Sequence, residues 1–216
     1  MDKYMKIGSI YERSDEKGHP LINGVFVSPE VEYLKDLKWI WTEKVDGTNI
    51  GVIWDGYKIT FQGRTEDANI QPKLLDALNN IFLNDTMEQK FEQVFGEKKV
   101  ILFGEGYGGY IQKHGRKYSE VESFIMFDVY FPESNLYLKR DAVEDVAKKL
   151  ALDVVPVIGE GTIDEAIEFA KVERKSTVGL CEAPMEGIVC RPAIDLRTRT
   201  GSMVIVKLKY KDLKNL

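Results

Sequence analysis

Cysteine and histidine are scarce in this sequence of 216 residues, which contains two of each. Cys181 and Cys190 form no CxxC pair, so neither a disulfide framework nor a zinc ribbon is expected. We expect both to be reduced, small hydrophobic side chains of a cytosolic protein. His19 and His114 lie far apart and match no spacing of metal ligands.

Long apolar runs are also missing. No segment approaches the roughly 18 apolar residues of a membrane-spanning helix. The start of the chain, Met1 to Lys6, lacks the apolar centre of a signal peptide. Repeats and low-complexity stretches are absent as well. The sequence therefore predicts a cytoplasmic protein with no membrane partner.

An excess of positive charge is the third absence, because 30 Lys and Arg face 35 Asp and Glu, for a net charge of -5. This balance excludes a chain that is basic all over, so a nucleic-acid site would have to be a local patch. The chain is 44% hydrophobic and 30% charged, which is typical of a globular protein. Its length favours one domain, with two small domains as the alternative.

Strand patterns dominate the first third of the chain, and helical patterns are interspersed among strands after it. Asp55-Gly56 is a hairpin signal, Gly96 a helix stop, and Thr162 with Glu165 a capping box. We predict an α+β fold with mostly antiparallel sheets and flanking helices. The expected strands are 39–45, 49–54, 57–62, 100–103, 123–131, 187–190 and 203–208; the expected helices are 72–83, 87–95, one capped by Asp141, and 163–170.

Gly104 to Gly109 satisfies GxGxxG after a strand and is expected to be a glycine-rich loop. A dinucleotide site needs a helix to start there, whereas Tyr110 to Tyr118 is polar and basic with Gly115 inside it. We therefore reject a dinucleotide site. The sequence also has no P-loop.

The segment Glu43-Lys44-Val45-Asp46-Gly47-Thr48-Asn49 lies at a tight turn between two predicted strands. On its own it fits two interpretations equally. Lys44 is either an exposed hairpin residue or a nucleophile.

Lys44-Val45-Asp46-Gly47 resembles the KxDG motif of the covalent nucleotidyltransferase superfamily, which contains DNA ligases, RNA ligases and mRNA capping enzymes. Segments resembling five further motifs follow in the superfamily's order, so the resemblance spans Glu43 to Lys209. They are Gly63-Arg64-Thr65, Phe103-Gly104-Glu105, Ser123 to Asp128, Glu186 to Val189, and Lys207-Leu208-Lys209.

Two details resemble the RNA ligase family, in particular RNA ligase 2 and the RNA-editing ligases. The first motif continues as Gly47-Thr48-Asn49, and Gly63-Arg64-Thr65 follows at a similar spacing. Asp46 is a departure, since some members of that group carry His there and DNA ligases share the Asp. The resemblance implies the adenylation-domain fold of ATP-dependent ligases.

The implied chemistry starts with attack of Lys44 on the α-phosphorus of ATP, which leaves AMP on the lysine. AMP then passes to an RNA 5'-phosphate, and a 3'-hydroxyl displaces it to form the phosphodiester. A lysine must be neutral to attack, yet its ordinary pKa is about 10.4. Neighbouring positive charge from Lys207, Lys209 and a bound Mg²⁺ would favour the neutral form.

Further roles are implied by the same resemblance. Lys207 and Lys209, at i and i+2 of one strand, share a face and would stabilise the charge that gathers on phosphorus. Glu186, with Glu105, would hold Mg²⁺ or Mn²⁺. The expected nucleotide-binding residues are Glu43, Asn49, Arg64, Glu105, Phe127, Lys207 and Lys209, with Phe127 stacked on adenine, Glu105 at the ribose, and Arg64 and Asn49 at the phosphate and the reacting ends.

Each of these residues also has an ordinary structural interpretation. Lys207 and Lys209 could be the solvated face of a terminal strand, and Phe127 a core residue. Glu186 could be a turn residue and Arg64 a surface arginine. None of these alternatives explains the ordered set.

We expect no OB-fold after Lys209, because Leu216, the last residue, lies only seven positions further on. We expect residues 1–216 to be a single adenylyltransferase domain, without a C-terminal OB or other ligase accessory domain. Three alternatives stay open: the domain works alone, a partner protein or domain supplies the functions of a C-terminal domain, or the chain is truncated. The basic segment Lys113 to Lys117 and the tail from Arg191 to Leu216 are candidates for RNA contacts, with a flexible solvated loop as the equal alternative for Lys113 to Lys117.

Three other functions stay open. A minimal ATP-dependent DNA nick ligase and a GTP-using capping guanylyltransferase share the superfamily's motifs. A catalytically inactive module that binds nucleotides or RNA ends would be expected to have lost Lys44, Glu186 or Lys209, and all three are present.

Overall fold

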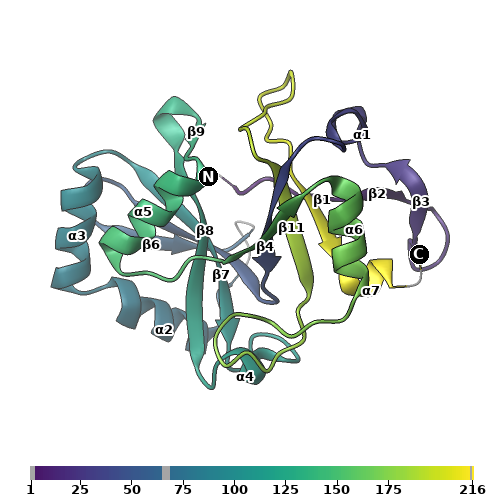
Figure 1. Cartoon of the computed structure of the whole chain (residues 1–216). Coiled ribbons are helices and arrows are strands. Elements are labelled where there is room, and N and C mark those ends of the chain that lie inside the picture. The colour runs from purple at the N-terminus through teal and green to yellow at the C-terminus, as the bar shows by residue number, and fades with distance from the viewer. Residues whose placement is uncertain (1–2, 65–68, 215) are drawn as a thin grey trace. The chain divides into compact units, whose positions relative to one another are not determined.

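The computed structural model describes residues 3–64, 69–214 and 216. The chain forms two compact units and passes between them several times (Figure 1). Unit 1 is built from Asp46–Val155, Gly179–Ala183 and a short N-terminal piece that includes Tyr4; unit 2 is built from Met5–Val45, Pro156–Val178 and Pro184–Leu216.

Unit 1 contains a five-stranded antiparallel sheet. The hairpin predicted at Asp55-Gly56 is present, with Asp55 N–H donating to the carbonyl of Lys58 at 3.3 Å. The strand order is β6 (Ile59–Gln62), β5 (Thr48–Trp54), β7 (Val100–Gly108), β8 (Glu122–Phe131) and β9 (Leu136–Tyr137).

Three helices, α2 (Pro72–Phe82), α3 (Asp85–Phe95) and α5 (Arg140–Leu150), cover one face of this sheet (Figure 1). Their apolar sides, exemplified by Leu78 and Phe91, pack on alternate strand residues such as Val52 and Leu102. Because successive strand side chains point to opposite faces, Asn49 and Glu105 lie on the face away from the helices.

Glycines let the helices and strands of unit 1 approach closely. A Cβ at Gly106 would lie 2.6 Å from Leu74 Cδ2, and one at Gly104 would overlap the ring of Phe124. The strand β7 therefore continues through Gly108, and the prediction of a loop from Gly104 is wrong. The glycines serve packing within the sheet, which also explains why GxGxxG marks no dinucleotide loop here.

Unit 2 contains a second five-stranded sheet and a separate two-stranded one, β2 (Tyr11–Arg13) with β3 (Leu21–Phe26). All neighbours in the larger sheet are antiparallel except β1 and β12. Its order is β1 (Gly8–Ser9), β12 (Val206–Lys209), β11 (Gly187–Pro192), β4 (Trp39–Lys44) and β10 (Val157–Gly161).

The helix α6 (Ile163–Lys171) packs on this sheet, and the predicted capping box is present. Its buried residues, such as Ile163 and Ala166, contact Trp39, Trp41 and Ile188 and their neighbours in one core. Strand alternation then turns Lys44, Lys207 and Lys209 to the other side, which we call the lysine face. The remaining helices are α1 (Pro29–Leu34) and α7 (Tyr210–Leu213) in unit 2, and α4 (Gly115–Tyr118) with a 3₁₀ turn (Pro132–Ser134) in unit 1.

The α+β prediction with antiparallel sheets is confirmed, with two local corrections besides the one at Gly104. Asp141 is not the cap of α5, because the helix begins at Arg140, whose guanidinium donates to the carbonyl of Val155 at 2.6 Å. The last strand begins at Val206 rather than Met203, because Met203 forms an isolated bridge with Arg197 instead. In the described part of the chain, no helix combines the length and apolarity needed to cross a membrane.

The two cysteines differ, although both were expected to be small hydrophobes. Cys190 is buried in unit 2 and burial raises the pKa of its thiol well above the ordinary value, whereas Cys181 is exposed. Since the thiolate is the reactive form, we expect a thiol reagent to modify one cysteine per native chain quickly and the second only after denaturation. A Cys181→Ser variant should lose the fast phase; two fast thiols in the native protein would contradict the structure.

Candidate active site

Three residues of the lysine face form one row across three strands. Gly187 on β11 is paired with Lys44 on β4 and with Lys209 on β12. Directly paired residues of antiparallel strands carry their side chains on the same face. The row therefore places the lysines 165 positions apart in sequence, Lys44 and Lys209, on either side of Gly187.

Glu186, the residue before Gly187, is held between these two lysines. Lys44 Nζ donates to Oε2 of Glu186, and Lys209 Nζ lies 2.5 Å from Oε1. The glutamate side chain is only 14% exposed. Burial by itself raises the pKa of Glu186, but the charges and hydrogen bonds of Lys44 and Lys209 outweigh it, so that the pKa lies below its ordinary value. The carboxylate is therefore ionised at neutral pH.

Gly187 is required at this position because the backbones of β11 and β12 approach closely. A Cβ there would overlap the carbonyl oxygen of Leu208. The Tyr210 N–H donates to the carbonyl of Glu186 at 3.1 Å, which ties the glutamate to the end of β12. Local backbone contacts thus fix Glu186 where both lysines reach it.

Lys207 lies on the same face one row away. Its partner on β11 is Val189, which is paired with Thr42 on β4. The predicted common face of Lys207 and Lys209 is thus present in the strand geometry. A phosphate on this face could meet up to three ammonium groups.

Glu43, although next to Lys44 in sequence, points to the opposite side of β4. Its side chain is 2% exposed. The Oε2 atom accepts from the backbone N–H of Thr177 at 2.8 Å and from the Thr177 hydroxyl at 2.6 Å, and Oε1 accepts from the hydroxyl of Ser176. Glu43 thereby anchors the loop that leads from α6 to Glu186.

This anchoring predicts a large stability effect. Glu43→Ala leaves two hydroxyls and a backbone N–H without their charged acceptor, and we expect a loss of about 2–3 kcal/mol in the free energy of unfolding by urea. Glu160→Ala is the matched control, since the exposed pair of Glu160 with Lys38 should contribute under about 1 kcal/mol. Equal losses in the two variants would show that the Glu43 contacts carry no special weight.

In unit 1, Asn49 and Glu105 are directly paired across β5 and β7 and share a face. The side chain of Glu105 lies against the KxDG turn, because a Cβ on Gly47 would stand 2.7 Å from Glu105 Cγ. Gln112 Nε2 donates to the carbonyl of Gly47 at 3.0 Å, and the Asp46 N–H donates to the hydroxyl of Tyr118 at 3.4 Å. Unit 1 thus holds the turn that follows the candidate nucleophile.

Phe127 is the extra residue of a β-bulge. Phe103 is paired with Asp128 and Gly104 with Met126, which leaves Phe127 between the two pairs. Its ring contacts Tyr4 edge-on, with 5.0 Å between the ring centres, and the Tyr4 hydroxyl donates to Asp128 Oδ2 at 2.6 Å. Phe127 is partly buried, as a platform for a base requires, and Tyr4 is a neighbour that the sequence did not point to.

The remaining predicted residues are less constrained. Arg64 is exposed, two residues after β6 ends, and Thr65 of the same motif lies outside the described residues. No cluster of three or more His, Cys, Asp and Glu side chains that could hold a metal occurs in residues 3–64, 69–214 and 216. A single carboxylate such as Glu186 is enough for the way Mg²⁺ is often bound, through one or two carboxylates together with substrate phosphates and water.

The RNA ligase family matches residues 37–210, most of the chain. The chain belongs to the RNA ligase family. The match includes all the candidate site residues, from Glu43 to Lys209. A comparison with curated proteins found no match.

Solved structures of a Naegleria gruberi RNA ligase have a similar fold. The form with PPi is 20% identical, with a TM-score of 0.65 over 85% of this chain and 52% of the other. Two mutant forms with ATP and Mn are each 17% identical, with TM-scores of 0.67; they cover 96% and 99% of this chain. This member of the RNA ligase family spans 52–62% of the length of those chains.

Proposed function

We propose that this protein is an ATP-dependent RNA ligase in which Lys44 carries AMP. The observation that carries the proposal is the pairing of Lys44 and Lys209 with one partly buried carboxylate, Glu186, on a single face. An ordinary exposed hairpin lysine would have no such partners. Family membership and the similar Naegleria gruberi RNA ligase structures, one with PPi and one with ATP and Mn, support ATP as the nucleotide.

In the first step the Nζ lone pair of Lys44 attacks the α-phosphorus of ATP. The bond from phosphorus to nitrogen forms, the bond to the bridging oxygen breaks, and pyrophosphate leaves with that electron pair. The ammonium form cannot attack, so Lys44 must leave its ion pair with Glu186 and release a proton beforehand. Lys209 and Lys207 would then stabilise the negative charge on the phosphoryl oxygens.

Glu186 in unit 2 is the proposed metal ligand, and the family resemblance also assigns Glu105 in unit 1 to metal or to the ribose. A divalent ion, Mg²⁺ or Mn²⁺, would neutralise phosphate charge and compete with Lys44 for the Glu186 carboxylate. Glu186 is suited to this because its low pKa keeps it ionised.

The later steps transfer AMP away from Lys44 and so regenerate its free amine. An oxygen of the RNA 5'-phosphate attacks the AMP phosphorus and the nitrogen–phosphorus bond of Lys44 breaks. A 3'-hydroxyl then attacks the 5'-phosphorus, AMP leaves, and the phosphodiester is complete. We assign Phe127 to the adenine ring, Glu105 to the ribose, Arg64 and Asn49 to phosphate and the RNA ends, and Glu43 to the nucleotide-binding set through its hold on the loop before Glu186.

We further propose that residues 1–216 act as one adenylyltransferase domain made of both units. A cytoplasmic location also stays a prediction. A partner protein or domain that supplies functions found in longer ligases is compatible with the share of their length that this chain spans.

The test is covalent labelling. Purified protein with Mg²⁺ and α-labelled ATP, or GTP in parallel, is denatured and examined for retained label, and mass spectrometry checks for AMP already bound. Acid-labile label from ATP, followed by its transfer to a 5'-phosphorylated RNA, is the expected result. Preferential labelling by GTP would favour a guanylyltransferase. Transfer of AMP to nicked DNA but not to RNA would favour a DNA ligase. A chain neither labelled nor pre-loaded would contradict the proposal.

A further inference from the structure

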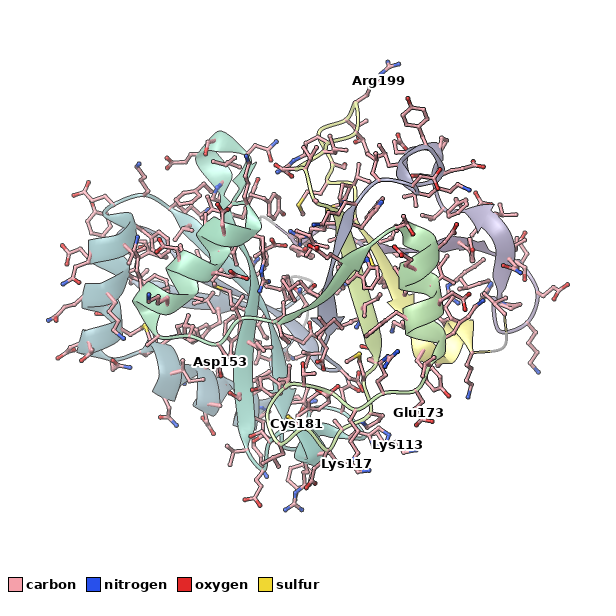
Figure 2. All side chains as sticks on the ribbon, viewed as in Figure 1. Lys113, Lys117, Asp153, Glu173, Cys181 and Arg199 are labelled. Atoms are coloured by element: carbon pink, nitrogen blue, oxygen red, sulfur yellow. The ribbon has the colours of Figure 1, made fainter. Side chains whose placement is uncertain are left out.

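An exposed aromatic ring surrounded by cations lies in the segment that follows β7. Tyr110 is 64% exposed. Lys73 Nζ, from the start of α2, lies 4.6 Å from the centre of its ring, and Arg116 Cζ lies 5.6 Å from it. Two further lysines of this segment are exposed, Lys113 just before α4 and Lys117 within it (Figure 2). We call these five residues the Tyr110 surface.

Cations outnumber carboxylates on the Tyr110 surface, where Glu122 Oε1 accepts from the backbone N–H of Tyr110 at 3.1 Å. Residues 109–119 contain three Lys and Arg and no Asp or Glu. Among the ion pairs found in the described part of the chain, none involves these three cations or Lys73. In a protein of net charge -5, such a patch needs a reason.

The backbone of this surface is firmly held. Tyr118 is buried, and the Gly109 N–H donates to the carbonyl of Ser119 at 2.9 Å. Gly115 is packed so closely that a Cβ would lie 2.6 Å from the carbonyl oxygen of Gly108. An exposed ring on a fixed backbone loses little conformational entropy when a ligand stacks on it.

The same segment is tied to the KxDG turn. Gln112 bonds the carbonyl of Gly47 and Tyr118 accepts from the N–H of Asp46. Asp46 follows Lys44 by two peptide links, which span at most roughly 7 Å. The segment 109–119 therefore does two things: it carries most of the Tyr110 surface, and it anchors the turn that follows Lys44.

We propose that the Tyr110 surface binds single-stranded RNA that leads to the end being joined. This inference rests on the proposed function. A base would stack on Tyr110 while Lys73, Lys113, Arg116 and Lys117 contact successive phosphates, the combination by which proteins hold single strands without reading their sequence. ATP has no need of this surface, so lysine adenylation should not depend on it.

The test measures RNA binding and adenylation separately. A fluorescent 12-nucleotide RNA with a 5'-phosphate is titrated by anisotropy at several salt concentrations, and Lys44 labelling by ATP is measured on the same preparations. Tyr110→Ala should weaken RNA binding about 10-fold. Tyr110→Phe keeps the ring and should bind like the unaltered protein. Both variants should label normally.

The cations are tested through the salt dependence. Each lost phosphate contact lowers the slope of log affinity against log salt by about 0.7 for a single strand. Lys73→Ala/Arg116→Ala should therefore lower the slope by roughly 1.4. Tyr57→Ala, at another exposed tyrosine, and Lys98→Ala/Lys148→Ala, with the same charge change, are controls that should stay within about twofold of the unaltered protein.

The outcomes separate the two proposals. If labelling is normal but the unaltered protein binds no RNA, or the variants of the Tyr110 surface bind like the controls, the surface proposal is overturned. If the unaltered protein is neither labelled nor pre-loaded, the proposed function fails, and the binding data alone still decide whether the surface holds RNA.

Discussion

Replacement of Lys44 by alanine is expected to abolish covalent labelling by ATP, with at least about a 1,000-fold loss relative to the unaltered chain. The amine of Lys44 is the proposed nucleophile, and the neighbouring amine of Lys209, which shares Glu186 with it, is assigned to charge stabilisation instead. The measurement is label retained after denaturation, with unfolding by urea recorded in parallel.

Two further variants make this result specific. Lys44→Arg keeps a cation beside Glu186, so the fold should persist, but a guanidinium does not deprotonate in proteins and labelling should still vanish. Lys38→Ala is the matched control, because Lys38 directly precedes β4 and its ammonium group forms an exposed ion pair with Glu160 at 2.6 Å. If label survives in Lys44→Ala and maps to Lys209, then Lys209 is the nucleophile and the assignment of Lys44 is wrong.

The part of the fold that sequence predicts well is the part with strong local signals. The capping box at Thr162, the hairpin at Asp55 and the stop at Gly96 are all present, since each depends on neighbours a few residues away. No element was predicted in the first 38 residues, so β1 to β3 and α1 were missed. The start of α1 does carry a local signal, because Ser28 caps the helix by accepting from the Val31 N–H and Pro29 is its first residue. The strand β1 pairs with β12 at the far end of the chain, a partner that local patterns cannot reveal.

The candidate site shows the same division. The sequence motifs, through the family they resemble, named Lys44, Glu186 and Lys209, and strand register explains why these three meet. Ser176 and Thr177 were missed because their partner, Glu43, is more than 130 residues earlier and a loop serine or threonine is an ordinary surface residue. Tyr4 beside Phe127 was missed for the same reason.

Glycines misled the sequence interpretation once. Gly104, Gly106 and Gly108 read locally as a loop, but two of them face tightly packed side chains of unit 1 and the strand runs through all three. Only the identity of the packed neighbours, Leu74 and Phe124, distinguishes a strand that needs glycine from a loop that tolerates it.

Glu186→Gln is expected to lower the rate of Lys44 labelling on the order of 100-fold, because the amide cannot hold a divalent ion as the carboxylate would. It should also destabilise the fold by about 2 kcal/mol at pH 7, since two ammonium groups then contact a neutral group. Glu160→Gln, at an exposed ion pair, is the control for both measurements.

The stability difference should depend on pH in a direction that the pKa of Glu186 fixes. Because that pKa is lowered in the folded protein by Lys44 and Lys209, the folded state binds the proton less tightly than the unfolded state. The carboxylate therefore stabilises the fold fully above its ordinary pKa of about 4.3, and this contribution is lost as the pH falls through the folded value. The free energy of unfolding by urea is measured for the unaltered protein and for Glu186→Gln between neutral and acid pH. The difference between the two should shrink toward zero in acid. A deficit that stays constant with pH, or a Glu186→Gln chain more stable than the unaltered one at pH 7, would mean that the lysine pair does not hold an ionised carboxylate, and Glu186 would lose its place as the proposed metal ligand.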